Sequence, residues 1–344
     1  MVTRSVPVAV ALATAVPWLG AGFVHAQAPS EVRALPLTET RYALGDQISA
    51  YRDFMRSGGP PPDGIPSIDS PRFIRADEAQ LAPEDMVIGI LLNGEARAYP
   101  QAIMVHHEIV NDRVGGTNVA VTYCPLTATA QGFLRGNSAL GVSGQLLNSN
   151  LVMYDRDSGS YISQIAATGL SGPYEGRGLT EVGLVWTTWE RWRSAHPDTQ
   201  VLSDRTGYLR NYSRDPYGSY NPPDGYYVED GTVFPVMHRS VRLHAKEMVV
   251  GARTSSGSAY FVLRDLASAR VLGTPSFIAV YDRALHTAHI YERSGADLPV
   301  ALPNGAVRMG DEEFAPDSLP LNRTVAVQAF FFAWHAFFPD SETP

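Results

Sequence analysis

Residues 86–99 read MVIGILLNGEARAY. The apolar run Met86–Leu92 has the length of a strand, stops at Asn93-Gly94, and resumes at Glu95. Asn-Gly between two such runs is typical of a β-hairpin with a two-residue type I′ turn. The pattern therefore predicts a hairpin, and Val119–Tyr123 is a second candidate for a buried strand.

Part of this pattern recurs further along the chain. The run Asp85–Gly89 reappears as Glu247–Gly251, and Trp192, five residues before a Pro-Asp pair, has a parallel in Trp334. A supersecondary unit used twice explains such self-similarity. We expect a β-rich α+β fold of two related lobes, produced by a weak internal duplication.

Composition divides the chain into five stretches. We expect a signal peptide at 1–26, a lead and linker at 27–62 with a short helix near Gln47–Arg56, a first lobe at 63–205 with the candidate site, a Tyr/Gly/Pro-rich surface loop or linker at 206–232, and a second lobe at 233–344 as a structural repeat.

The first residues have the form of a secretory signal. Arg4 precedes a small, apolar run from Val6 to Val24, and Ala26 ends a segment that a signal peptidase would accept. We expect a periplasmic or secreted mature protein. The alternative, an uncleaved membrane anchor, is opposed by Pro and Gly within the run. No other stretch is apolar over the ~18 residues that a span requires, so we expect no stable membrane span after cleavage.

Charge and cysteine content argue against a nucleic-acid partner and exclude an internal disulfide. The 344 residues carry 35 acidic and 27 basic side chains, a net charge of −8, and Lys246 is the only lysine. An acidic chain without a basic stripe is a poor binder of polyanions, so no nucleic-acid partner is expected. A single cysteine, Cys124, cannot form an internal disulfide.

Side chains of the types found in catalytic and metal sites gather near the short connection that leads into the strand ending at Cys124. The segment His106-His107-Glu108 leads, through two glycines, into the strand that ends at Cys124. Imidazole and thiolate are ligands for soft and borderline metals. The same pair can also activate a thiol as a nucleophile, with Glu108 or Asp112 orienting the imidazole. We therefore take Cys124, His107 and Glu108 as candidate catalytic residues, against the alternative that the thiol and imidazole are merely packed structural groups.

Several of these stretches together resemble the DUF3179 family, a domain of unknown function. The matching segments lie between about residues 63 and 340 and include Asp63–Pro71, Ala98–Pro100, His107–Asp112, Thr122–Leu126, Val142–Gly144, Asn148–Asp155, Ser163-Gln164, Thr188-Trp189 and Pro197–Thr199.

One departure from the family pattern concerns the cysteine motif. The family usually shows Tyr-Cys-Pro-Leu-Cys, and here Thr127 stands at the second cysteine. A Cys pair suits a soft metal or a dithiol couple. With Thr127, the resemblance implies altered specificity or lost activity, and a metal site would need His107 beside Cys124, with Glu108 or Met153 as further ligands.

Three hypotheses follow. The first is an exported metal-dependent protein, redox or metal-handling, that holds copper or iron at His107, Cys124, Glu108 and Met153. The second is a non-catalytic binding or scaffold module whose loop tyrosines contact an unknown small molecule or protein. The third is a thiol hydrolase that uses Cys124 with His107. We prefer the first.

Overall fold

The structure is a computed structural model that describes residues 35–38 and 47–344. The predicted signal peptide, residues 1–26, lies outside the described residues. Across the described ranges, no helix combines the length and apolar character needed to cross a membrane.

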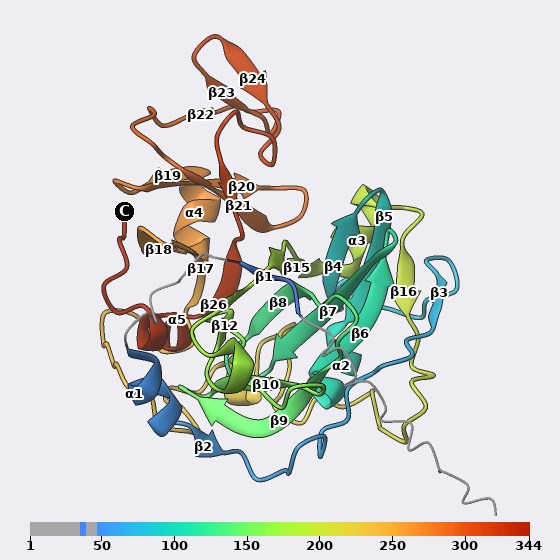
Figure 1. Ribbon diagram of the computed structural model, residues 1–344. Helices are drawn as coiled ribbons and strands as arrows, with labels where there is room; N and C mark the ends of the chain where they lie inside the picture. The colour runs from blue at the N-terminus through green and yellow to red at the C-terminus, as the bar shows by residue number, and fades with distance from the viewer. Residues whose placement is uncertain (1–34, 39–46) are drawn as a thin grey trace, which may run out of the picture. The chain divides into compact units, whose positions relative to one another are not determined.

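Short strands dominate the described chain and form several sheets, so the predicted β-rich character is confirmed (Figure 1). The longest sheet has the order β1 (Leu37–Thr38), β13 (Gly178–Leu179), β12 (Thr168–Gly169), β11 (Tyr161–Ser163), β10 (Asn150–Asp155), β9 (Leu140–Leu147), β2 (Arg56–Ser57). A second sheet has the order β14 (Glu181–Val182), β8 (Thr129–Leu134), β7 (Thr117–Cys124), β6 (Ile109–Val114). A third has the order β15 (Val185–Thr188), β4 (Met86–Leu92), β5 (Glu95–Pro100), β16 (Gln200–Leu202), β3 (Phe73–Arg75).

Three smaller sheets follow in the last third of the chain. They are β18 (Gly257–Val262), β17 (Met248–Thr254), β26 (Val327–Phe330); β19 (Val271–Gly273), β20 (Phe277–Asp282), β21 (Thr287–Glu292), β25 (Arg323–Thr324); and β22 (Val300–Ala301), β23 (Val307–Met309), β24 (Glu312–Phe314). The helices are α1 (Ile48–Asp53), α2 (Gln101–His107), α3 (Trp189–Ala195), α4 (Leu263–Ala269) and α5 (Phe331–Phe337), with 3-10 turns at η2 (Gly172–Tyr174) and η3 (Gly225–Tyr227).

The hairpin predicted from residues 86–99 is present as β4 and β5. Asn93 and Gly94 have φ values of 49° and 82°, so both central residues of the turn are left-handed. This is the type I′ geometry that the Asn-Gly pair predicted. The strand expected at Val119–Tyr123 lies within β7, and α1 falls inside the range expected for a short helix.

A glycine in this hairpin makes room for a tryptophan from α3. A Cβ atom on Gly89 would lie 2.3 Å from the ring of Trp192, a distance that no side chain tolerates. The indole N–H of Trp192 donates to Thr199 Oγ1 at 3.0 Å, which fixes the ring. The same packing occurs in the last third of the chain, where a Cβ on Gly251 would lie 2.4 Å from Trp334.

The stretch after β5 holds both a helix and a strand, which periodicity alone could not separate. Helix α2 ends at His107, and Glu108 adopts a left-handed conformation with φ 58°. Strand β6 then begins at once and pairs with β7. This sharp reversal of the chain sets the positions of the candidate site residues His107, Glu108 and Cys124.

Candidate functional site

The left-handed residue Glu108 connects α2 to the end of β7. Its N–H donates to Met104 O at 2.7 Å, and its carbonyl accepts from Tyr123 N at 2.7 Å. Cys124, the last residue of β7, follows Tyr123 directly. The sequence expectation that one short connection brings this segment to Cys124 is therefore met for Glu108.

The thiol of Cys124 is almost completely buried, with 2% of the residue exposed. It points toward Ser149 O, with a sulfur–oxygen distance of 3.8 Å. Burial, followed by the nearby Glu108 charge, raises the pKa of the thiol to about 12. The sulfur is therefore protonated at neutral pH and is not a nucleophile in this state.

The carboxyl group of Glu108 is largely buried and makes no hydrogen bond or ion pair with the described residues. The residue is 8% exposed, and no hydrogen bond or ion pair reaches its side chain from residues 35–38 or 47–344. Burial alone raises its pKa to about 8. Near pH 7 the group is mostly neutral, since an isolated buried carboxylate is costly.

The imidazole of His107 has different neighbours. Its Nδ1 lies 2.8 Å from Pro66 O, and its Nε2 lies 2.6 Å from the Tyr212 hydroxyl. Because a carbonyl only accepts, Nδ1 carries the proton and Nε2 accepts from Tyr212. Burial lowers the pKa of this histidine, which keeps it neutral.

The structure thus divides the predicted ligand set. Glu108 and Cys124 interact, and Met153, fully buried on β10, belongs to the same apolar cluster as Cys124. His107 instead hydrogen-bonds to Pro66 and Tyr212. In the described part of the chain, no three His, Cys, Asp or Glu side chains form a group suited to a metal ion. Binding of one metal ion by His107, Cys124, Glu108 and Met153 together remains a prediction.

Residues 206–232, expected to be a surface loop or linker, supply the cover of this region. Tyr217 and Tyr226 pack against the Cys124 cluster, and Tyr226 donates to Leu126 O at 2.7 Å. Burial, with added charge effects from Cys124, raises the pKa of both phenols above their ordinary value. Sequence reasoning did not place these rings at the site, because they lie about a hundred residues from it along the chain.

A second buried network lies beside the first. The hydroxyls of Tyr123 and Tyr220 are 2.6 Å apart, and Tyr227 donates to Asp215 Oδ2 at 2.8 Å. Gln101 donates to the same carboxylate oxygen at 2.7 Å. Three of the loop tyrosines, Tyr220, Tyr226 and Tyr227, therefore use their hydroxyls within the chain.

The only lysine fixes this cover in place. Lys246 is 6% exposed, and its Nζ donates to Tyr226 O at 2.8 Å. The ammonium also lies 3.2 Å from the centre of the Tyr226 ring, which is a cation–π contact. Burial lowers its pKa to about 8. Its solitary place in the sequence was the one signal that singled it out.

Comparisons with known proteins give one match. A family model described as "Protein of unknown function (DUF3179)" matches residues 62–341. Comparison with curated proteins and with solved structures finds no match.

Proposed function

We propose, on the premise that this chain belongs to the DUF3179 family, that it is an exported protein that binds a soft metal ion at Cys124 and Glu108. The observation that carries this proposal is the largely buried Glu108 carboxyl, which has no hydrogen-bond or ion-pair partner among the described residues and lies near a buried free thiol. A bound cation would provide the countercharge that the folded chain does not.

The chemistry of the neighbouring groups favours copper or iron over a hard cation. Thiolate and thioether ligands select soft metals, and Met153 lies in the same cluster as Cys124. Metal binding displaces protons from its ligands, so the protonated thiol and carboxyl are compatible with such a site. Because Thr127 removes the dithiol option, we favour metal handling over dithiol redox chemistry. Recruitment of His107 would require Tyr212 to leave Nε2.

The test is an anaerobic titration of purified protein with Cu(I), buffered by a competing chelator. We expect one bound ion per chain, loss of binding in Cys124→Ser, and affinity at least ~tenfold weaker in Glu108→Gln and Met153→Leu. The matched control is Met104→Leu, a buried methionine of α2 in a different cluster, which should bind as wild type does. Unchanged binding in both Cys124→Ser and Glu108→Gln would refute the site, as would no binding by wild type.

A second candidate function, a non-catalytic binding module, has one observation in its favour. Five of the eight exposed large hydrophobic residues found in the described chain lie between residues 208 and 241, namely Tyr208, Leu209, Val228, Val233 and Val241. A photo-crosslinking amino acid at position 209, which is 98% exposed, would capture a partner bound there. A crosslink at position 209 but not at the exposed Leu91 would support this function.

Export belongs to the same proposal and rests on the sequence of residues 1–26. We expect the mature protein to begin at Gln27, after cleavage beyond Ala26. The intact mass of protein purified from the producing cell measures this directly. A mass that retains residues 1–26 would support the membrane-anchor alternative.

We also propose that the chain arose by duplication of one β-hairpin–helix unit. In the first unit β15 pairs with β4 and leads into α3, and Trp189 N donates to Asp85 O at 2.7 Å. In the second, β26 pairs with β17 and leads into α5, and Phe331 N donates to Glu247 O at 2.8 Å. Asp85 and Glu247 correspond in the repeat read from the sequence, and Trp189 and Phe331 each lie three residues before its repeated tryptophan.

The turn that follows the site strand supports the same proposal. Cys124 pairs with Thr129 across β7 and β8, and Asp282 pairs with Thr287 across β20 and β21. Both turns contain a left-handed residue at the same place, Ala128 with φ 51° and His286 with φ 50°. When the two turns are matched in this way, Asp282 of the second unit corresponds to Cys124 of the first. The second unit therefore lacks the thiol, which fits a different role.

A further inference from the structure

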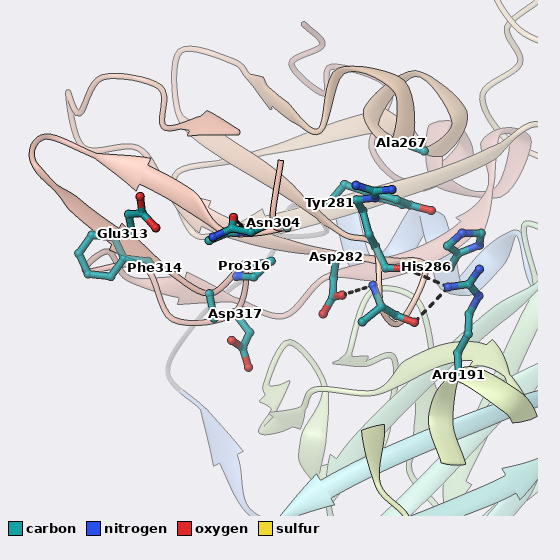
Figure 2. Close-up of a pocket in the computed structure, with 15 residues that line it drawn as sticks. Arg191, Ala267, Tyr281, Asp282, His286, Asn304, Glu313, Phe314, Pro316 and Asp317 are labelled. Carbon is teal, nitrogen blue, oxygen red and sulfur yellow. Dashed lines mark hydrogen bonds between the residues drawn. The ribbon is translucent and has the colours of Figure 1, made fainter. Parts of the chain in front are cut away.

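A cleft of about 1090 Å³ lies beside the β20–β21 turn, away from the residues of the metal proposal (Figure 2). Its walls come from α3, from this turn, and from β24 with the residues that follow. Cavities of such size hold small ligands when a few polar groups converge on them. Positively charged and negatively charged residues of this cleft lie at opposite ends.

One end of the cleft is cationic. Arg191 of α3 donates through Nη1 to Arg283 O at 2.9 Å and to Ala284 O at 3.2 Å. These bonds fix the guanidinium, and no described residue accepts from its remaining nitrogens. Arg283 and His286 also line the cleft, and Figure 2 shows His286 beside Arg191. A fixed guanidinium with free donors is suited to a carboxylate, which it can bind through two parallel hydrogen bonds.

The opposite end is acidic. Glu313 and Asp317 line it and lie across the cleft from Arg191 in Figure 2. Neither side chain has an ion-pair partner within the described ranges. Asp282 lies between the two ends, with Oδ1 already accepting from the N–H groups of Ala284 and Leu285.

Apolar surface lies beside each charged end. The ring centre of Tyr281 is 5.8 Å from that of His286, and Phe314 adjoins Glu313 in β24. A ligand for this cleft therefore needs an anionic group at one end, a cationic group at the other, and apolar atoms between them. Three carboxylates against two guanidinium groups disfavour a polyanion.

We propose that this cleft binds a short peptide, with the peptide's free C-terminal carboxylate at Arg191 and an amino group at Glu313 and Asp317. A peptide has the required charges at its ends and uncharged backbone and side chains between them. Binding here is independent of a metal at Cys124, so failure of either proposal leaves the other intact.

The test compares two probes that differ in one charge. Binding of lysyl-alanyl-alanine and of its C-terminal amide to the full-length mature protein is measured by calorimetry at low salt. We expect the free acid to bind about tenfold more tightly, since a hydrogen-bonded charge contributes on this scale. No binding of the acid, or equal affinity for acid and amide, would overturn the proposal.

Two variants and one control locate the site. Arg191→Gln should weaken binding of the acid about tenfold and abolish the preference over the amide. Asp317→Asn, at the other end, should weaken both probes alike. Arg193→Gln is the matched control, because Arg193 lies two residues along the same helix and lines other grooves. If Arg193→Gln weakens binding as much as Arg191→Gln does, the interaction is nonspecific and the inference is wrong.

Discussion

The carboxyl group of Glu108 links the candidate site to folding through its pKa. Burial raises that pKa from 4.5 to about 8, so the folded chain retains a proton that the unfolded chain releases. The associated stability is complete below pH 4.5 and is lost as pH rises toward 8. In metal-free protein, we predict that Glu108→Gln becomes progressively more stable relative to wild type across this window, by at most about 1.4 kcal/mol for each pH unit.

Urea unfolding of wild type and Glu108→Gln at pH 5.5 and pH 7.5 measures this trend. Glu84→Gln provides the control, because it removes a carboxyl group that is exposed. A Glu108→Gln difference that is the same at both pH values would mean that the carboxyl is ionised in the folded chain.

The thiol of Cys124 should be unreactive toward alkylating reagents in the folded protein. Raising its pKa from 9.0 to about 12 lowers the thiolate population about a thousandfold at any pH below both values. We predict that iodoacetamide modifies Cys124 at pH 8 about a thousandfold more slowly in the native chain than in urea, as followed by mass spectrometry. Comparable rates would restore the thiol hydrolase hypothesis.

At this scale the sequence predicted a site shared by His107, Glu108 and Cys124, and the structure brings Glu108 to Cys124 while His107 bonds to Pro66 and Tyr212. Glu108 and Cys124 share a region because β6 and β7 are adjacent strands, and that adjacency is readable from a short connection. His107 and Glu108 are neighbours in sequence, yet the left-handed backbone at Glu108 gives their side chains different partners. Tyr217, Tyr226 and Lys246 reach the region through tertiary contacts, which local patterns do not encode.

Among the elements, the two glycine–tryptophan contacts are the most specific packing feature. We predict that Gly89→Ala and Gly251→Ala each destabilise the protein by about 1–3 kcal/mol, because the added methyl group must displace the Trp192 or Trp334 ring. Thermal unfolding of the two variants measures this.

Gly183→Ala is the matched control for this pair, since a Cβ there would meet no atom within 4 Å. Its unfolding free energy should lie within about 0.5 kcal/mol of wild type. If only one of the two glycine variants is destabilised, the two contacts are not energetically equivalent, and the duplication proposal loses a supporting observation.

Helices and strands were predicted correctly where the sequence contains residues that are specific to one type of turn. The Asn-Gly pair predicted both the hairpin and its turn type. Helix α3 begins at Trp189, directly after Val185–Thr188, which pairs with β4. Residues 206–232 contain little regular structure apart from a 3-10 turn, so their composition predicted their conformation. It did not predict that Tyr217, Tyr220, Tyr226 and Tyr227 would be directed inward.

Across the whole molecule, a buried ion pair joins strands distant in sequence. Arg253 of β17 donates to Glu181 of β14 at 2.8 Å, with side chains 1% and 4% exposed. We predict that Glu181→Gln destabilises the fold by about 3–5 kcal/mol, because the Arg253 charge stays buried without its carboxylate. The exposed pair Arg52–Glu175 is the control, and Glu175→Gln should cost less than about 1 kcal/mol. Equal losses in the two variants would contradict the argument.

The buried position of Lys246 has a practical consequence for handling this protein. With the only ε-amino group inside the fold, reagents that acylate amines meet no exposed lysine in the native chain. Unfolding would expose Lys246, so acylation of its side chain would report the loss of native structure.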